Sequence, residues 1–174
     1  SEKDVLNRFY ESAKLLGADV IVRITGDCPL VDAVLVDQCI QGYKDAKVDY
    51  FSNIDPITYP DGLDVEVMSF LSLKIANHEA SSDFDREHVT PYIRNSNRFL
   101  KASIQHTEDL SNQRWSVDEP EDLVVVTNIF KYFSPNIFFD WMQVLELKKL
   151  QPSLFDENQQ IKNNEGATMG TGQK

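Results

Sequence analysis

Apolar positions along this chain switch between helical and strand-like spacing. Over residues 1–16 they recur every three or four positions, which predicts an amphipathic helix that Gly17 ends. A continuous, largely β-branched run over 18–25 then predicts a buried strand. Gly26 and Asp27 follow it as a turn, and Asp32 is suited to cap a second helix in which Leu35, Cys39 and Tyr43 face inward.

The same helical and strand-like spacings of apolar residues recur as far as residue 150. They predict strands over 49–52, 64–68, 99–105 and 114–117, and helices over 70–80, 81–95, 119–133 and 139–150. Pro91 is expected to kink the helix over 81–95. Alternating strand and helix signals predict an α/β fold with an open mixed sheet flanked by helices.

Composition changes near the C-terminus. The 174 residues are 41% hydrophobic and 26% charged, and they fit one domain with a real core. We assign that domain to residues 1–155 and expect 156–174, rich in Asn, Gln, Gly and Lys, to be a linker or disordered tail toward a possible downstream domain. No apolar run is long enough to span a membrane.

The net charge of -11 and the pI near 4.6 argue against nucleic acid as a partner, because such binding depends on Lys and Arg neutralising phosphates. A small phosphate ligand held through a metal ion remains compatible with this charge. Cys28 and Cys39 form no CxxC pair, and no signal peptide is visible. We therefore expect reduced, buried thiols and a cytoplasmic location.

Two acids follow predicted strands. Asp27 stands after Gly26, and Asp118 precedes the helix that begins at Glu119-Pro120. Each has a simpler interpretation, Asp27 as a turn residue and Asp118 as a helix cap. Together they resemble a pair of carboxylates that shares one Mg²⁺ with phosphate oxygens, so we take both as candidate catalytic and metal-binding residues.

Further candidates lie in polar segments. Asp61, Gly62, Asp64 and Glu66 are suited to hydrogen bonding with sugar hydroxyls, although the pattern by itself favours a polar solvent face behind a Pro-Asp-Gly turn. His88 is a candidate ligand for an anion or a structural histidine. Arg23 and Arg114 are candidate phosphate or substrate residues, with a salt bridge as the alternative for each.

Five motifs in order resemble the cytidylyltransferases of the spore-coat polysaccharide biosynthesis type, which are relatives of acylneuraminate and KDO cytidylyltransferases. They span about residues 1–133 and are Asp4-Val5-Leu6-x-Arg8-Phe9-Tyr10, Ala18 to Leu30 with Gly-Asp-Cys-Pro-Leu, Tyr59 to Glu66 with Asp-Gly-Leu-Asp-Val-Glu, Asp85 to Ile93 with Asp-Arg-Glu-His, and Arg114 to Leu123 with Val-Asp-Glu-Pro-Glu-Asp. The resemblance implies a partial nucleotide-diphospho-sugar transferase (Rossmann-like) fold.

The resemblance also implies transfer of CMP from CTP to a sugar or sugar acid. It makes Asp27 and Asp118 the Mg²⁺ ligands and Asp64 and Glu66 acceptor candidates. The family's N-terminal strand and Arg-Leu-Pro-Gly-Lys-type loop are absent, so we expect this chain to be the C-terminal portion of the domain and weakly active alone. Related enzymes are often dimers, which makes a homodimer a further expectation.

Two other functions stay open. A glycosyltransferase that uses a nucleotide-sugar usually carries an Asp-x-Asp metal motif; Gly26-Asp27-Cys28 does not match it, and Asp64-Val65-Glu66 matches it only loosely. A non-catalytic dimerisation or scaffold module would use the same acids only as caps and turns.

Overall fold

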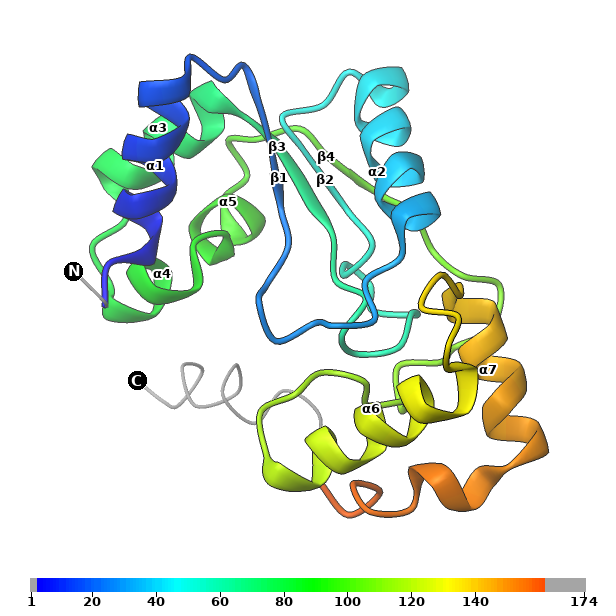
Figure 1. Ribbon diagram of the computed structural model, residues 1–174. Helices are drawn as coiled ribbons and strands as arrows, with labels where there is room; N and C mark the ends of the chain where they lie inside the picture. Colours follow the sequence, from blue (N-terminus) through cyan, green and yellow to red (C-terminus); the bar gives the residue numbers. More distant parts are fainter. Residues whose placement is uncertain (1–2, 162–174) are drawn as a thin grey trace. The chain divides into compact units, whose positions relative to one another are not determined.

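The computed structural model describes residues 3–161 (Figure 1). Its contacts divide these residues into two compact units. Unit 1 holds the described residues within 1–23, 37–55 and 65–104, and unit 2 holds those within 24–36, 56–64 and 105–174. The chain passes through each of these units more than once.

Unit 1 contains a four-stranded mixed sheet in the order β1-β3-β2-β4. Strand β3 pairs antiparallel with β1 and β2, and β4 pairs parallel with β2. The strands are β1 (Val20–Arg23), β2 (Tyr50–Ser52), β3 (Glu66–Ser69) and β4 (Lys101–Ser103). The predicted α/β class and open mixed sheet are confirmed, and the strands begin one or two residues later than the apolar pattern predicts.

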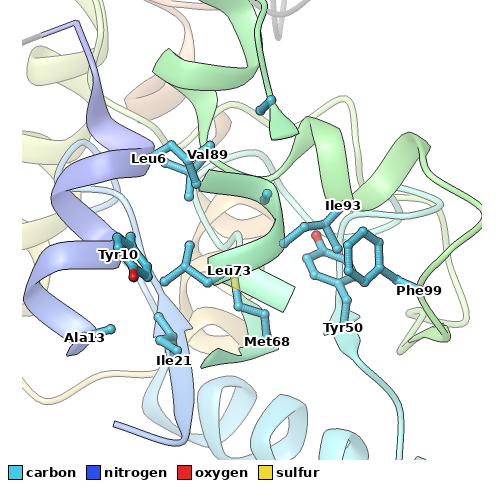
Figure 2. Packing of buried hydrophobic residues seen from close by; sticks show 12 residues of the cluster. Leu6, Tyr10, Ala13, Ile21, Tyr50, Met68, Leu73, Val89, Ile93 and Phe99 are labelled. Atoms are coloured by element: carbon cyan, nitrogen blue, oxygen red, sulfur yellow. The ribbon is translucent and has the colours of Figure 1, made fainter. Parts of the chain in front are cut away.

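One face of the sheet carries the hydrophobic core of unit 1. Ile21, Met68 and Tyr50 are in register across β1, β3 and β2, and all three are buried in this core. Helices α1 (Val5–Leu16) and α3 (Phe70–Glu79) contact each other and contribute Leu6, Tyr10 and Leu73 to the same cluster. Figure 2 shows these side chains converging from the helices and the strands. Gly17 ends α1 in the left-handed conformation, as predicted.

The opposite face presents Val67 and Phe51, whose neighbours in the strands point the other way. Helix α2 (Ala33–Ala46) begins in unit 2 and continues into unit 1, where Gly42 lies directly against the Phe51 ring. A Cβ atom at Gly42 would stand 2.3 Å from that ring, so the close approach of helix and strand requires glycine.

The predicted helix over 81–95 is wrong in one respect. The structure contains two short helices, α4 (Asp83–His88) and α5 (Pro91–Asn95), separated by Val89 at a φ of 73°. The Val89 side chain is buried in the core of unit 1, whereas its backbone conformation ends α4. Pro91 therefore starts a new helix, as suits a residue without a free N–H, rather than kinking a long one.

Unit 2 is built from α6 (Pro120–Phe133), α7 (Trp141–Leu150), a 3₁₀ turn η1 (Pro152–Phe155) and long connecting segments. Its buried Asp32 joins two helix starts. One Asp32 oxygen accepts from the Leu35 amide at 2.9 Å, which caps α2 as predicted, and the other accepts from the Trp141 amide at 3.2 Å. A single carboxylate thus orders the first turns of both helices.

The predicted strand over 114–117 is wrong. Arg114 forms only an isolated parallel bridge with Asp61. The Trp115 amide donates to Asp61, and the Val117 amide donates to Asp27. An extended run becomes a strand only when a neighbouring strand accepts its hydrogen bonds in sequence, and here consecutive bonds go to different loops.

Part of the predicted tail is packed against unit 2. Asn158 is buried, and its side-chain amide donates hydrogen bonds to the Arg114 carbonyl oxygen and to the Asp122 carboxylate. Residues 162–174, the rest of that predicted tail, lie outside the described residues. The division into a domain over 1–155 and a linker stays a prediction.

Candidate functional site

The backbone of unit 2 brings the two predicted metal ligands to adjoining turns. The Val117 amide donates to the Asp27 carbonyl oxygen at 2.8 Å, so Asp118 and Asp27 belong to segments in direct hydrogen-bond contact. Asp27 is half-buried, and the side chain of Asp118 is 51% exposed. Segments far apart in the sequence therefore meet through the backbone beside these two acids.

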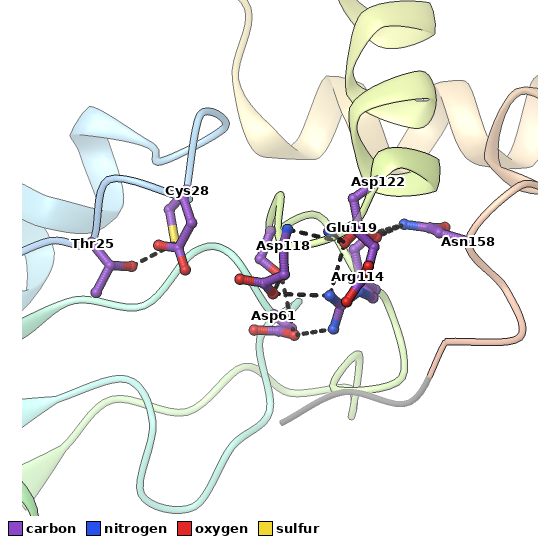
Figure 3. A network of polar contacts seen from close by, with 10 residues as sticks. Thr25, Cys28, Asp61, Arg114, Asp118, Glu119, Asp122 and Asn158 are labelled. Carbon is purple, nitrogen blue, oxygen red and sulfur yellow. Dashed lines mark hydrogen bonds and ion pairs between the residues drawn. The ribbon is translucent and has the colours of Figure 1, made fainter. Parts of the chain in front are cut away.

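Arg114 ties this region together (Figure 3). Its Nε and Nη2 donate to the two oxygens of Asp122 at 2.9 and 2.8 Å, and the same Nη2 donates to Asp118 Oδ2 at 2.9 Å. Arg114 Nη1 lies 3.8 Å from Asp61 Oδ2. The predicted salt-bridge alternative for Arg114 is therefore realised, with three acids around one buried guanidinium.

Asp122 is the buried partner in this network, with 0% of its surface exposed. Burial alone raises the pKa of its carboxyl, but hydrogen bonds from Arg114, from Asn158 and from the amides of Glu119 and Asp118 outweigh burial, and the pKa is about 2. The carboxylate is thus ionised at neutral pH. Its bonds to the Asp118 and Glu119 amides close the first turn of α6.

Asp61 and Gly62 lie against the same segment. The Asp61 amide donates to Gln113, and its side chain is 13% exposed beside Ser116. Burial raises the pKa of Asp61, with Arg114 opposing the shift and Asp118 adding to it. Gly62 has a φ of 101°, and a Cβ there would stand 2.6 Å from the Ser116 nitrogen. Gly62 therefore permits the backbone approach that sets Asp61 beside Asp118.

The oxygens of Asp27 and Asp118 suit a shared divalent cation. The contacts of Asp118 to Arg114 and Ser116 both use Oδ2, and the thiol of Cys28 reaches only Oδ1 of Asp27, at 3.5 Å. Among described residues, each carboxylate thus keeps one oxygen without a protein hydrogen bond. Mg²⁺ is commonly held by one or two carboxylates that leave positions for phosphate oxygens and water.

Within residues 3–161, no group of three or more His, Cys, Asp or Glu side chains is arranged to hold a metal ion. A site made of two carboxylates leaves coordination positions for phosphate oxygens and water.

Two predicted substrate residues contact each other in unit 1. Arg23 pairs with Glu66 across β1 and β3, and the second Glu66 oxygen accepts from the Tyr50 hydroxyl. Glu66 is 1% exposed. Glu66 is thus a buried acid of the sheet that half-buried Arg23 neutralises, and the salt-bridge alternative holds for Arg23.

Two further predicted substrate residues, His88 and Asp64, belong to different units. His88 is the last residue of α4 in unit 1, with its ring 4.5 Å from that of Phe84, which is the structural alternative. The strand predicted over 64–68 begins at Glu66 in the structure, so Asp64 precedes β3 rather than forming part of it. Asp64 stays a candidate for substrate contact.

The site also contains residues that the motifs left without a role. Asp122 is part of a motif, but nothing in the sequence distinguishes it from a surface acid at a helix start. Asn158 stands in a stretch that looks like a linker.

Cys28 is buried, as predicted, and burial raises the pKa of its thiol to about 12, with Asp27 adding to the shift. This thiol is therefore protonated and unreactive at neutral pH.

A mixed sheet with acids on neighbouring connecting segments defines an α/β protein whose candidate site lies on its loops. The sequence model of the family described as "Cytidylyltransferase" matches residues 1–163. The chain belongs to the cytidylyltransferase family.

Two relatives are similar to this chain over most of its length. The chain is 37% identical over 166 residues to an uncharacterized protein of Methanocaldococcus jannaschii, covering 94% of this chain and 64% of that protein. It is 31% identical over 135 residues to the spore coat polysaccharide biosynthesis protein SpsF of Bacillus subtilis, covering 75% and 55%. The chain thus spans about 55–64% of the length of these relatives.

The fold is also that of a solved cytidylyltransferase from Leptospira borgpetersenii. The two structures have a TM-score of 0.84 at 28% identity, over 92% of this chain and 68% of the other. No helix among the described residues is both long and apolar enough to cross a membrane.

Proposed function

We propose that this chain forms part of the active site of a nucleotidyltransferase that moves CMP from CTP to a sugar or sugar acid. Asp27 and Asp118 are the ligands of one Mg²⁺. Membership of the cytidylyltransferase family supports the nucleotide, and the similarity to a protein named for polysaccharide biosynthesis supports the sugar.

One observation carries the proposal. The hydrogen bond from the Val117 amide to the Asp27 carbonyl joins two turns that each present an acid, and each acid keeps an oxygen without a protein partner among the described residues. Caps and turns alone would not require two such oxygens on adjoining segments. A scaffold module is therefore the weaker interpretation.

The chemistry follows from the charges. Mg²⁺, when bound, neutralises phosphate charge and stabilises the charge that develops during displacement at phosphorus. Asp27 and Asp118 hold their carboxylates in fixed positions, because the backbone bond at Val117 and the Arg114 contact restrain both segments. A fixed arrangement of this kind lowers the barrier mainly through positioning.

The acceptor hydroxyl oxygen attacks the α-phosphorus and forms a new phosphorus–oxygen bond, the bond from the α-phosphorus to the bridging oxygen of the β-phosphate breaks, and pyrophosphate and the hydroxyl proton are released. Asp61 and Asp64, in the same unit as the acid pair, are the proposed hydrogen-bond partners of the acceptor hydroxyls. Arg23 and Glu66 are left out of this acceptor site because they neutralise each other inside unit 1.

The test is equilibrium dialysis of labelled CTP against the chain, with and without Mg²⁺. We expect weak retention that requires Mg²⁺ and that falls at least tenfold, on the order seen when a site carboxylate is lost, in Asp27→Asn and Asp118→Asn. Asp109→Asn is the matched control, because Asp109 is an exposed acid of the same unit whose side chain accepts hydrogen bonds from nearby Ser111.

The competing nucleotide decides between enzyme classes. UDP-glucose should not displace CTP. If UDP-glucose is retained in place of CTP, the chain is a glycosyltransferase. If the folded chain retains neither nucleotide at any Mg²⁺ concentration, the nucleotide site is refuted for these residues.

A further inference from the structure

We propose that Arg114, Asp122 and Asn158 form a positioning group that sets the carboxylate of Asp118 for the cation, and that Arg114 is not a substrate-binding residue. This inference rests on the proposed function, since it takes Asp118 as a metal ligand. All four residues belong to unit 2.

Asp122 is the centre of the group. Its Oδ1 accepts from Arg114 Nε and from Asn158 Nδ2, both at 2.9 Å. Its Oδ2 accepts from Arg114 Nη2 and from the amides of Asp118 and Glu119, at 2.8, 3.1 and 3.0 Å. The buried carboxylate of Asp122 therefore holds the backbone at Asp118. It also holds the Arg114 guanidinium, which contacts the Asp118 side chain.

Arg114 transmits this order to the Asp118 side chain. Its Nη2 contacts Asp118 Oδ2 at 2.9 Å, and Ser116 donates to the same oxygen at 3.3 Å. Both restraints act on Oδ2, so Oδ1 is the oxygen presented to a cation. The charge of Arg114 is already matched by Asp122 and Asp118, and its side chain is buried, which leaves a phosphate little to attract.

Asn158 completes the group from a distant part of the chain. Its Nδ2 donates to the Arg114 carbonyl at 3.1 Å and to Asp122 Oδ1, and the residue is buried. Because Asn158 is uncharged, it contributes orientation rather than net charge. It links the segment after η1 to Arg114 and Asp122, which stand on either side of Asp118 in the sequence, so its loss should loosen Asp118 without changing the charge of the site.

The experiment compares Asn158→Ala with the control Gln159→Ala. Gln159 is the exposed neighbour of Asn158, and within residues 3–161 its side chain bonds to Asp156 alone. Affinity for Mn²⁺, used as the probe in the presence of CTP, is measured from the loss of the electron paramagnetic resonance signal of free Mn²⁺. We expect Asn158→Ala to weaken Mn²⁺ binding about tenfold, as losses of groups behind a metal ligand do, and Gln159→Ala to leave it unchanged.

A second measurement does not depend on the metal. Hydrogen exchange at the Asp118 and Glu119 amides, followed by NMR, should accelerate in Asn158→Ala and not in Gln159→Ala, because those amides bond to the carboxylate that Asn158 holds. Arg114→Lys should keep the fold and still weaken Mn²⁺ binding, since lysine cannot donate to Asp122 and Asp118 from a planar fork.

The failures are distinct. If the unsubstituted chain and Asp118→Asn bind Mn²⁺ equally, the metal assignment in the proposed function is wrong. If Asp118→Asn loses Mn²⁺ but Asn158→Ala retains full affinity and normal amide exchange, the positioning group is refuted while the metal assignment stands. If Asn158→Ala does not fold, Arg114→Lys with unchanged affinity refutes the group instead.

Discussion

Gly62 has no side chain where the backbone of Trp115 and Ser116 occupies the space. Its φ of 101° and the 2.6 Å approach of the Ser116 nitrogen to a Cβ position make alanine strained there on two counts. We expect Gly62→Ala to lower the free energy of unfolding by about 3 kcal/mol, measured by urea denaturation. Gly26→Ala is the control, because a Cβ at Gly26 meets nothing within 4 Å, and it should be nearly neutral.

Glu66 is a buried residue whose two oxygens are used by Arg23 and Tyr50. Glu66→Gln leaves the Arg23 charge without its partner, which typically costs about 3 kcal/mol of unfolding free energy. Glu79→Gln, which breaks the exposed pair with Arg98, should change stability little. A Glu66→Gln variant as stable as the original chain in urea denaturation would refute this structural role.

Asp122 makes the free energy of unfolding depend on pH in the acidic range. Its folded pKa of about 2 lies below the ordinary value of 3.8, so folding favours the ionised form. The contribution, about 2 kcal/mol, is complete above pH 4 and is lost as the pH falls from about 4 to 2. We expect urea denaturation to show this loss in the original chain and a smaller one in Asp122→Asn. Parallel profiles for the two proteins would contradict it.

At the scale of elements, the sequence predicts best those helices whose bounds are set by their own residues. Helical periodicity with a glycine stop gives α1, and Glu119-Pro120 marks the start of α6 within a residue. Prediction of secondary structure fails where contacts with distant segments determine the backbone conformation. Residues 114–117 have strand-like composition but no neighbouring strand, and Val89 breaks a helix because its side chain is drawn into the core.

Asp32 illustrates how one side chain organises two elements. Its oxygens accept from the Leu35 amide at the start of α2 and the Trp141 amide at the start of α7. Asp32→Ala leaves both donors without that acceptor in a buried place, and we expect a loss of about 2 kcal/mol in the free energy of unfolding by urea. The control Asp140→Ala removes one exposed cap of α7 and should cost about half as much.

At the scale of the whole molecule, the candidate site is assembled within unit 2 from three separate stretches of chain, around Asp27, Asp61 and Asp118. The family motifs single out these acids in advance, because each stands in a recognisable run. The sequence offers salt bridges for Arg114 and Arg23 as an alternative, but it does not identify their acidic partners, and it does not predict that Asn158 is buried. Those facts depend on which distant segments meet, and single-sequence patterns report only local periodicity.

The central claim is that Asp27 and Asp118 share one divalent cation. The most direct test is paramagnetic broadening of backbone amide NMR signals by substoichiometric Mn²⁺ with CTP present. We predict that signals of residues 26–28 and 117–119 broaden first, that those of residues 109–111 stay sharp, and that Asp27→Asn abolishes the effect. Broadening centred on another segment, or unchanged in Asp27→Asn, would contradict the claim.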